Sequence, residues 1–331
     1  MKKLSVGVIG LGIGEQHIIG YLKSKYIKSV CIFDKDKQKA NQIQKKYPIK
    51  KVYQSDLEMI CDKEIDIISI ASYDDCHFKQ IIMSLNHNKH IFCEKPICQN
   101  FYELKKISSL LKKNKNLVMT TNTVLRCSPR FKKIKKEFES NIFGKVYFME
   151  LDYNYGRLNK ITNGWRGKIE NYSVVLGGGI HMLDLLLWFK NSYPKKISSF
   201  QNNICTKGSD NLIQDFVISL LQFNDGSVAK VSSNFGCIYP HFHRVMIYGK
   251  KKTFEQSFTT NAYLSSKGDG KILKETVKEK YPGVNKYDLI DNFISSILTK
   301  EKLIINQKQM LSVMQLCLEI NKSLKLTNKG K

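Results

Sequence analysis

The segment that most directly suggests chemistry is residues 90–96 (HIFCEKP), where an apolar predicted strand runs into a charged pair and a proline. Pro96 disfavours a helical conformation at Lys95, so we expect the strand to end at Glu94 and Lys95. A lysine at the carboxyl end of a strand lies where open α/β sheets bind ligands. A strand that ends in a solvated charge pair and a turn is the alternative interpretation, and these residues alone leave both open.

A glycine-rich turn near the start of the chain predicts a phosphate-binding site. Residues 4–9 (LSVGVI) are a predicted strand that leads into Gly10, Gly12 and Gly14 and then into a helix. Glycines let backbone N–H groups approach a pyrophosphate, and the N-terminus of a helix favours negative charge. Glu15 stands where the third glycine of the dinucleotide fingerprint would be, which leaves the closeness of the strand–helix packing open.

Asp34 follows the second predicted strand, residues 29–33, and its carboxylate suits the ribose diol of a dinucleotide. A carboxylate would repel a ribose 2′-phosphate, so we expect NAD as the cofactor. NADP remains possible because Lys35 and Lys37 follow at once. The alternative role of Asp34 is an N-cap for a helix that starts at Lys35, and both roles can coexist.

The first half of the chain alternates predicted strands with predicted helices, which indicates a doubly wound parallel sheet. The further strands are expected at residues 52–53, 65–71, 90–93 and 117–120, and the further helices from residue 56, at 75–88 and at 101–113.

The sequence resembles the glucose–fructose oxidoreductase, inositol dehydrogenase and MocA (Gfo/Idh/MocA) family of nicotinamide-dependent oxidoreductases. Four features in family order carry the resemblance: Gly10-Leu11-Gly12 with His17; Ala71-Ser72 with His77; Glu94-Lys95-Pro96; and Gly177-Gly178-Gly179 leading to His181 and Asp184. In the family, the lysine at the position of Lys95 contacts both the nicotinamide end of the cofactor and the reacting hydroxyl.

The resemblance also implies which residues hold the cofactor. They are Gly10, Gly12, Ile13, Gly14, Asp34, Ser72, Tyr73, His77, Glu94, Lys95 and Asn122. Many relatives have Pro-Asn where this chain has Tyr73 and Asp74, in a loop that faces the nicotinamide ribose. The contacts of that loop are therefore expected to differ here.

From residue 145 the pattern changes to strands expected at 146–151, 196–200, 215–223, 227–235 and 244–248, and residues 224–226 (NDG) predict a hairpin turn. We expect a Rossmann domain at residues 1–122 and an α+β domain with a mostly antiparallel open sheet at 123–331. The last helices, expected at 287–298 and 307–324, pack back beside the nucleotide domain in the family.

In the second half, His181 and Asp184 are expected on one face of a helix, where a carboxylate can fix the tautomer of an imidazole and raise its basicity. A buried core histidine is the alternative, and the preceding glycines and the resemblance favour a catalytic pair. Many relatives have an aspartate at the position of Gly177 that helps to hold substrate hydroxyls. The identity of the substrate therefore does not carry over from inositol or glucose enzymes.

Further substrate contacts are expected from Arg126, whose alternative is a surface residue near a helix start, and from Trp165 and Arg166. An aromatic ring beside a cation suits a sugar face or a phosphate, and a loop anchor is the alternative. His241 and His243 would share one face of a strand, but with no third ligand in sight we expect no metal site.

The 331-residue chain has a net charge of +25, with 54 basic residues against 29 acidic ones. The lysines are spread along the whole chain, which argues against a nucleic-acid partner, and no apolar run reaches the length of a membrane span. Nine cysteines without metal-ligand spacing indicate free thiols and a cytoplasmic protein.

These features predict a cytoplasmic NAD(P)-dependent oxidoreductase that moves a hydride between nicotinamide and a hydroxyl-bearing carbon of a sugar, sugar derivative or nucleotide sugar. Lys95 would polarise the substrate oxygen, His181 would exchange its proton, and Asp184 would orient His181. The alternative is a regulator of the same family that binds the dinucleotide without catalysis. The resemblance also implies a homodimer or homotetramer.

Overall fold

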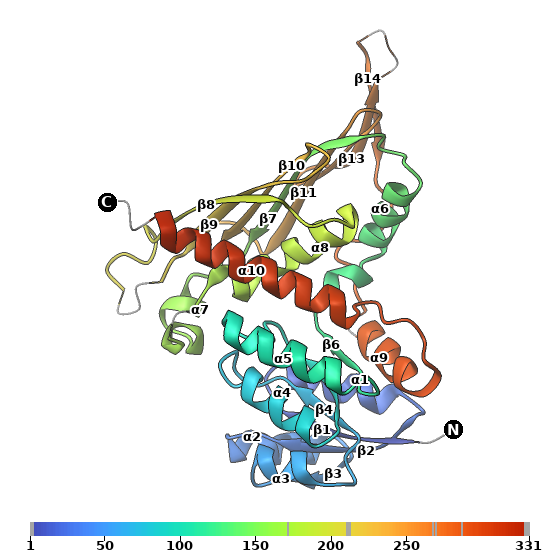
Figure 1. The fold of residues 1–331 in the computed structure, drawn as a ribbon, viewed down its shortest axis with the longest axis vertical. Coiled ribbons are helices and arrows are strands. Elements are labelled where there is room, and N and C mark those ends of the chain that lie inside the picture. Colours follow the sequence, from blue (N-terminus) through green and yellow to red (C-terminus); the bar gives the residue numbers. More distant parts are fainter. Residues whose placement is uncertain are drawn as a thin grey trace. The chain divides into compact units, whose positions relative to one another are not determined.

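The computed structural model describes residues 3–170, 172–209, 213–266, 268, 270–285 and 287–327 (Figure 1). The chain divides into two compact units. The first contains Met1–Cys127 and Val284–Gln315, and the second contains Ser128–Gly283 and Leu316–Lys331.

The first unit is built on a six-stranded parallel sheet in the order β3-β2-β1-β4-β5-β6, which confirms the predicted doubly wound sheet. Its elements, in chain order, are β1 (Leu4–Ile9), α1 (Gly14–Lys23), β2 (Ile27–Phe33), α2 (Lys37–Lys46), β3 (Ile49–Val52), α3 (Asp56–Cys61), β4 (Ile67–Ile70), α4 (His77–Asn86), β5 (His90–Cys93), α5 (Phe101–Lys113), β6 (Met119–Thr121), the 3-10 turn η1 (Val124–Cys127) and α9 (Asp288–Thr299). The strand order reverses between β1 and β4, and ligands bind such sheets at the carboxyl ends of the strands beside that point.

Helices cover both faces of this sheet, as two neighbouring residues of β1 show. A Cβ added to Gly7 would meet Met59 of α3, whereas Val8 contacts the Cβ position of Gly14 in α1. Successive strand residues point to opposite faces, so α1 and α3 lie on opposite sides. Helix α9 lies with α1, since a Cβ on Gly20 would meet Ile290 at 2.8 Å.

The part of the first unit that comes after residue 283 is bonded to the end of the first sheet. The Thr120 hydroxyl of β6 donates to the Ile305 carbonyl at 2.8 Å, and the Gln307 amide donates to the Leu117 carbonyl at 3.0 Å. This segment therefore belongs to the first unit, although in the sequence it lies between two stretches of the second unit.

The second unit is built on an eight-stranded sheet in the order β14-β13-β12-β11-β7-β10-β9-β8, in which β7 and β10 are parallel and all other neighbours antiparallel. Its elements are α6 (Pro129–Glu139), β7 (Val146–Asn154), α7 (Asn159–Thr162), the 3-10 turn η2 (Trp165–Lys168), the π-helical turn η3 (Val175–Gly179), α8 (Ile180–Lys190), β8 (Lys196–Asn202), β9 (Phe216–Gln222), β10 (Val228–Asn234), β11 (Phe242–Gly249), β12 (Thr253–Gln256), β13 (Asn261–Ser266) and β14 (Ile272–Thr276). The predicted mostly antiparallel sheet is confirmed. Helix α10 (Gln307–Thr327) runs from the first unit into the second.

The two faces of β7 have opposite character. Tyr153 points to the face that η3 and α8 cover, and a Cβ on Gly178 would meet its ring. Asp152 points to the other face, where Lys230 and Arg244 reach its carboxylate at 2.9 Å each.

The three glycines before His181 precede helix α8, as expected. They form the π-helical turn η3, which continues directly into α8. A Cβ on Gly178 or Gly179 would meet the side chains of Tyr153 and Ser233, so only glycine lets this turn lie so close to the sheet.

Among the described residues, no helix has both the length and the hydrophobicity needed to cross a bilayer. All nine cysteines are free thiols.

Candidate active site

The turn between β1 and α1 has the backbone that a dinucleotide-binding turn needs. Gly10 has a φ of +84°, and a Cβ at this position would lie 2.5 Å from the Ala71 carbonyl oxygen. At Gly12 the nearest atom to an added Cβ is the Lys39 Nζ, 3.9 Å away. Gly10 is therefore fixed by the fold, whereas Gly12 faces open space that a phosphate group could approach.

Gly14 allows the close contact between strand β1 and helix α1 that the third glycine of the fingerprint would otherwise allow. Glu15 stands at the position of that third glycine. A Cβ on Gly14 would lie 3.1 Å from Val8 Cγ1 and 3.2 Å from the Ala71 Cβ, so a larger residue would push α1 away from the sheet. The Glu15 carboxylate accepts hydrogen bonds from Lys46 at 2.7 Å and from the Tyr47 hydroxyl at 2.9 Å. Glu15 thus takes no part in the packing that the third glycine would provide.

Asp34 links the end of β2 to the glycine turn. Its carboxylate accepts hydrogen bonds from the backbone N–H groups of Leu11 at 2.6 Å and Asp36 at 2.9 Å. The alternative role as an N-cap is wrong, because α2 begins at Lys37 and its N-cap is Asp36, which accepts from the Lys39 N–H at 3.1 Å. Asp34 is left beside the turn, where a carboxylate can reach a ribose.

Glu94, at the carboxyl end of β5, is buried and bonded to His17 of α1 and to Asn122, which follows β6. Its Oε1 accepts from the Asn122 amide at 2.6 Å and from His17 Nε2 at 3.1 Å, while His17 Nδ1 lies 3.0 Å from the Ser69 hydroxyl. Burial alone would raise the pKa of Glu94, but the bond from His17, the charge of Lys95 and the bond from Asn122 outweigh it and lower the pKa to about 2. Glu94 is therefore ionised at neutral pH, and His17 Nε2 donates a hydrogen bond to it.

The loop after Glu94 is tied to the loop after β4 through His77. Lys95 is half-buried and joined to Pro96 by a cis peptide bond. The fully buried His77 ring places Nδ1 2.7 Å from the Pro96 carbonyl and Nε2 3.1 Å from the Ser72 carbonyl. These contacts give His77 a role in holding two loops together, and a direct contact with a cofactor stays a prediction.

Three other predicted residues lie at or near these loops. Tyr73 and Ile13 are 52% and 43% exposed, so both side chains are available to a ligand. Ser72 donates its hydroxyl to Gln80 at 2.6 Å.

Arg126 is buried within the first unit. Its Nη1 donates to Gln309 at 2.9 Å and to the Ile304 carbonyl at 3.3 Å, so it anchors residues 304–309. The alternative of a surface residue is wrong, and substrate binding by Arg126 stays a prediction.

The second unit contributes His181, which lies at the start of α8 within a cluster of rings. The ring centroid of Tyr153 lies 6.0 Å from that of His181, 5.2 Å from that of His241 and 5.3 Å from that of His243. Asp184 follows one helical turn later and is buried. The sequence pointed to His181 and Asp184, but Tyr153 and the proximity of the three histidines were missed.

Two further tyrosines shape this ring cluster. A Cβ on Gly177 would collide with the Tyr172 hydroxyl, so that hydroxyl occupies the space in which a larger residue at 177 would begin. The Tyr281 hydroxyl accepts from the His243 backbone N–H at 3.0 Å and therefore directs its own proton to His243 Nδ1, at 2.5 Å. His243 is then protonated on Nε2. Burial, together with the charge of His241, lowers its pKa to about 3, so its ring is neutral at physiological pH.

Arg166 lies beside Trp165, with the guanidinium carbon 4.4 Å from the indole centroid. In the part of the chain that the structure describes, no group of three or more histidine, cysteine or acidic residues could hold a metal ion.

Two family models match the chain. Residues 4–122 match the oxidoreductase family with an NAD-binding Rossmann fold, and residues 131–255 match the GFO/IDH/MocA C-terminal domain. The chain belongs to the GFO/IDH/MocA family. It is accordingly an NAD-dependent oxidoreductase.

Curated relatives are distant but cover most of the chain. The myo-inositol 2-dehydrogenase of Thermotoga maritima is 22% identical over 268 residues, which is 75% of this chain and 73% of the relative. The inositol 2-dehydrogenase/D-chiro-inositol 3-dehydrogenase of Shouchella clausii is 23% identical over 74% of this chain and 70% of its own length.

Solved structures share the fold over the whole length. The myo-inositol 2-dehydrogenase of Lactobacillus plantarum has a TM-score of 0.84 at 17% identity, with 98% of both chains covered. A scyllo-inositol dehydrogenase of Lactobacillus casei, solved with NAD(H) and scyllo-inositol, and a UDP-N-acetylglucosamine 3-dehydrogenase of Acidithiobacillus ferrooxidans each have a TM-score of 0.79 at 18% identity, again with 98% of both chains covered.

Proposed function

We propose that this protein transfers a hydride between NAD and a hydroxyl-bearing carbon of a sugar, sugar derivative or nucleotide sugar. The observation that carries the proposal is the buried, ionised Glu94 next to Lys95 at the carboxyl end of β5. Relatives whose names describe dehydrogenases of inositols and of a nucleotide sugar support it, and favour catalysis over the alternative of a regulator.

The first unit fits NAD. The left-handed backbone of Gly10 and the open approach at Gly12 suit a pyrophosphate, and the Asp34 carboxylate beside the turn suits a ribose diol. NAD, when bound, supplies the redox chemistry, because its nicotinamide ring exchanges a hydride with the substrate carbon. We assign the remaining cofactor contacts to Ile13, Gly14, Ser72, Tyr73, His77, Glu94, Lys95 and Asn122, and we expect NAD to be preferred over NADP.

The protein's own residues accept and return the one proton of the reaction. The negative charge of Glu94 attracts the ammonium group of Lys95, so Lys95 acts as a hydrogen-bond donor that polarises the substrate oxygen. When the substrate is oxidised, its hydroxyl proton passes to a ring nitrogen of His181, and in the reverse direction His181 returns it. Asp184 orients the imidazole, and Arg126, Trp165 and Arg166 hold the substrate.

We also propose a role for each domain and a cellular location. Residues 1–122 bind the cofactor and residues 123–331 bind the substrate and a second copy of the chain, in the cytoplasm. We call the face of the second sheet to which Asp152 points its outer face. Phe200 and Leu220 are exposed on this face, and such apolar side chains support self-association.

The experiment that tests the function follows absorbance of the reduced cofactor with NAD and with NADP across inositols, aldoses, sugar acids and nucleotide sugars. Reduction of NAD by one of these classes is the expected result. No reduction by any class, with NAD binding confirmed by calorimetry, would contradict the proposed activity.

A further inference from the structure

Assuming the proposed function, we propose that the second unit selects substrates that carry an anionic group, a carboxylate or a phosphate, through Arg157, Arg166 and the Tyr153 cluster. The Tyr153 cluster is defined as Tyr153, Tyr155, His181, His241 and His243. Neutral polyols such as inositols would then be poor substrates, in contrast to the relatives that are named inositol dehydrogenases.

The Tyr153 cluster is a continuous arrangement of rings around Tyr153, which contacts each of the other four. Tyr155 stacks on Tyr153 with 5.8 Å between centroids and an interplanar angle of 19°, and it meets His241 edge-on at 5.4 Å. The rings of His241 and His243 are 5.0 Å apart. An imidazole or phenol provides an N–H or O–H donor, and two of these rings, Tyr153 and His243, lie next to His181.

Two arginines add positive charge to this donor-rich surface. The guanidinium carbon of Arg157, an exposed side chain, lies 5.4 Å from the centroid of the Tyr155 ring. Burial and the neighbouring Tyr155 raise the pKa of Tyr153, whereas the charges of Arg166 and Arg157 act to lower it. Both guanidinium groups therefore act electrostatically at the centre of the cluster, and arginine forks bind carboxylates and phosphates well.

Negative charge is directed away from the same surface. Asp152, next to Tyr153 in β7, points to the other face of the sheet and is paired with Arg244 and Lys230. One helical turn before His181, the space at Gly177 is taken by the neutral Tyr172 hydroxyl. Two further carboxylates nearby, Asp184 and Asp215, are buried, and Asp215, beside Gly236, accepts from the Thr206 N–H at 2.7 Å. An anion at the exposed side chains would therefore meet two cations and neutral donors.

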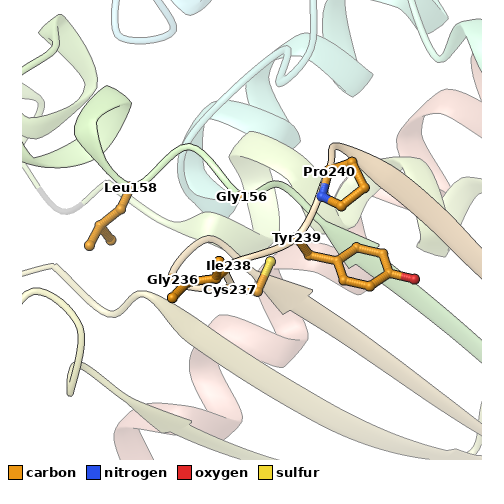
Figure 2. Close-up of a pocket in the computed structure, with 7 residues that line it drawn as sticks. All are labelled: Gly156, Leu158, Gly236, Cys237, Ile238, Tyr239 and Pro240. Atoms are coloured by element: carbon orange, nitrogen blue, oxygen red, sulfur yellow. The ribbon is translucent and has the colours of Figure 1, made fainter. Parts of the chain in front are cut away.

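Room for a larger substrate lies between the two loops that carry Arg157 and His241. Gly156 and Leu158 on one loop and residues 236–240 on the other line a hollow of about 570 Å³, open to solvent (Figure 2). Its size falls within the range of pockets that hold small ligands. The two loops are fixed together, because a Cβ on Gly156 would collide with the Tyr239 carbonyl oxygen.

The test is calorimetric titration of the full-length protein, saturated with NADH, with glucose, glucuronate and glucose 6-phosphate. We expect at least one of the two anions to bind about tenfold more tightly than glucose, since a hydrogen bond to a charged group typically contributes that much. Tighter binding of glucuronate identifies a carboxylate, and tighter binding of glucose 6-phosphate identifies a phosphate. The Arg157→Gln and Arg166→Gln variants should each lose most of this advantage of the anion over glucose.

Lys196→Gln is the matched control, because it removes one exposed positive charge from β8 in the same unit. It should keep the preference for the anion. Equal or weaker binding of both anions relative to glucose, including no binding by any of the three, would overturn the proposal, as would loss of the preference in Lys196→Gln alone. Turnover is measured separately, so a protein that prefers anions but never reduces NAD would contradict the proposed function and leave this inference standing.

Discussion

At the scale of residues, Glu94 places a buried negative charge next to Lys95 in the candidate site. Its carboxylate is buried, yet the bonds from His17 and Asn122 and the charge of Lys95 keep its pKa at about 2. An ionised carboxylate in that position fixes the end of β5 and attracts the lysine that follows. The sequence predicted Glu94 and Asn122 as cofactor residues, but their mutual hydrogen bond depends on the register of β5 and β6, which no local pattern reveals.

The pH dependence of stability provides a test of this arrangement. The folded-state pKa of Glu94 lies below its ordinary value of 4.5, so its contribution to stability is present above pH 4.5 and is lost as the pH falls toward 2. We expect Glu94→Gln to lower the free energy of unfolding by about 2–3 kcal/mol at pH 7 and to flatten its decline between pH 5 and pH 3. Urea unfolding at several pH values measures both effects.

Glu64→Gln is the control for that experiment, because Glu64 forms an exposed ion pair with Lys50. Its effect at pH 7 should be much smaller. If Glu94→Gln had the same stability and the same pH profile as the wild type, the assigned ionisation of Glu94 would be wrong.

At the scale of elements, the two glycines of the β1–α1 turn have different roles: Gly10 is required by the fold, and Gly12 leaves room for a ligand. Gly10 has a positive φ and no room for a Cβ, whereas the space at Gly12 is open in the protein itself. The glycine pattern predicted the turn from sequence. The close packing by Gly14 in place of Glu15 could not be predicted, because it depends on the side-chain positions of Val8 and Ala71.

Alanine substitutions should distinguish the two glycines. Gly10→Ala should destabilise the first unit by about 1–3 kcal/mol, because it combines backbone strain with a collision at the Ala71 carbonyl. Gly12→Ala should leave thermal unfolding unchanged and weaken NAD binding about tenfold or more, because its methyl group fills the approach to the phosphates. Thermal unfolding and NAD calorimetry measure the two effects, and wild-type NAD affinity in Gly12→Ala would contradict the assigned phosphate site.

Elements with a regular pattern were predicted well, and those without one were missed. Strong alternation or apolar runs marked β1, β5 and β7 to β11, and amphipathic spacing marked the last two helices, α9 and α10. Strands β12, β13 and β14 were not predicted: β12 has only four residues, and all five residues of β14 are exposed. The helical state of the glycines in η3 was also missed, because tertiary contact with the sheet overrides the low helix propensity of glycine.

At the scale of the whole molecule, we propose that the outer face of the second sheet binds a second copy of the chain. Phe200 on β8 and Leu220 on β9 point to this face and are 61% and 47% exposed. Exposed apolar side chains on neighbouring strands mark interaction surfaces in soluble proteins. The sequence implied self-association only through the family, since exposure on a sheet face requires the register of the strands.

We expect light scattering to give at least twice the chain mass of 38.2 kDa. The double variant Phe200→Asp, Leu220→Asp should be monomeric with unchanged thermal unfolding of the separate chain, because both side chains already face solvent in the single copy. A variant that keeps the wild-type mass would exclude this face as the contact surface.

The central claim is that Lys95 acts on the substrate in an NAD-dependent oxidation. The most direct measurement compares the turnover of Lys95→Ala and the wild type by absorbance of reduced NAD, with NAD affinity determined by calorimetry on the same samples. The predicted result is a loss of turnover of about a thousandfold or more with NAD affinity within about threefold of the wild type, since the lost bond acts mainly on the reacting oxygen. Turnover near that of the wild type in Lys95→Ala would contradict the account.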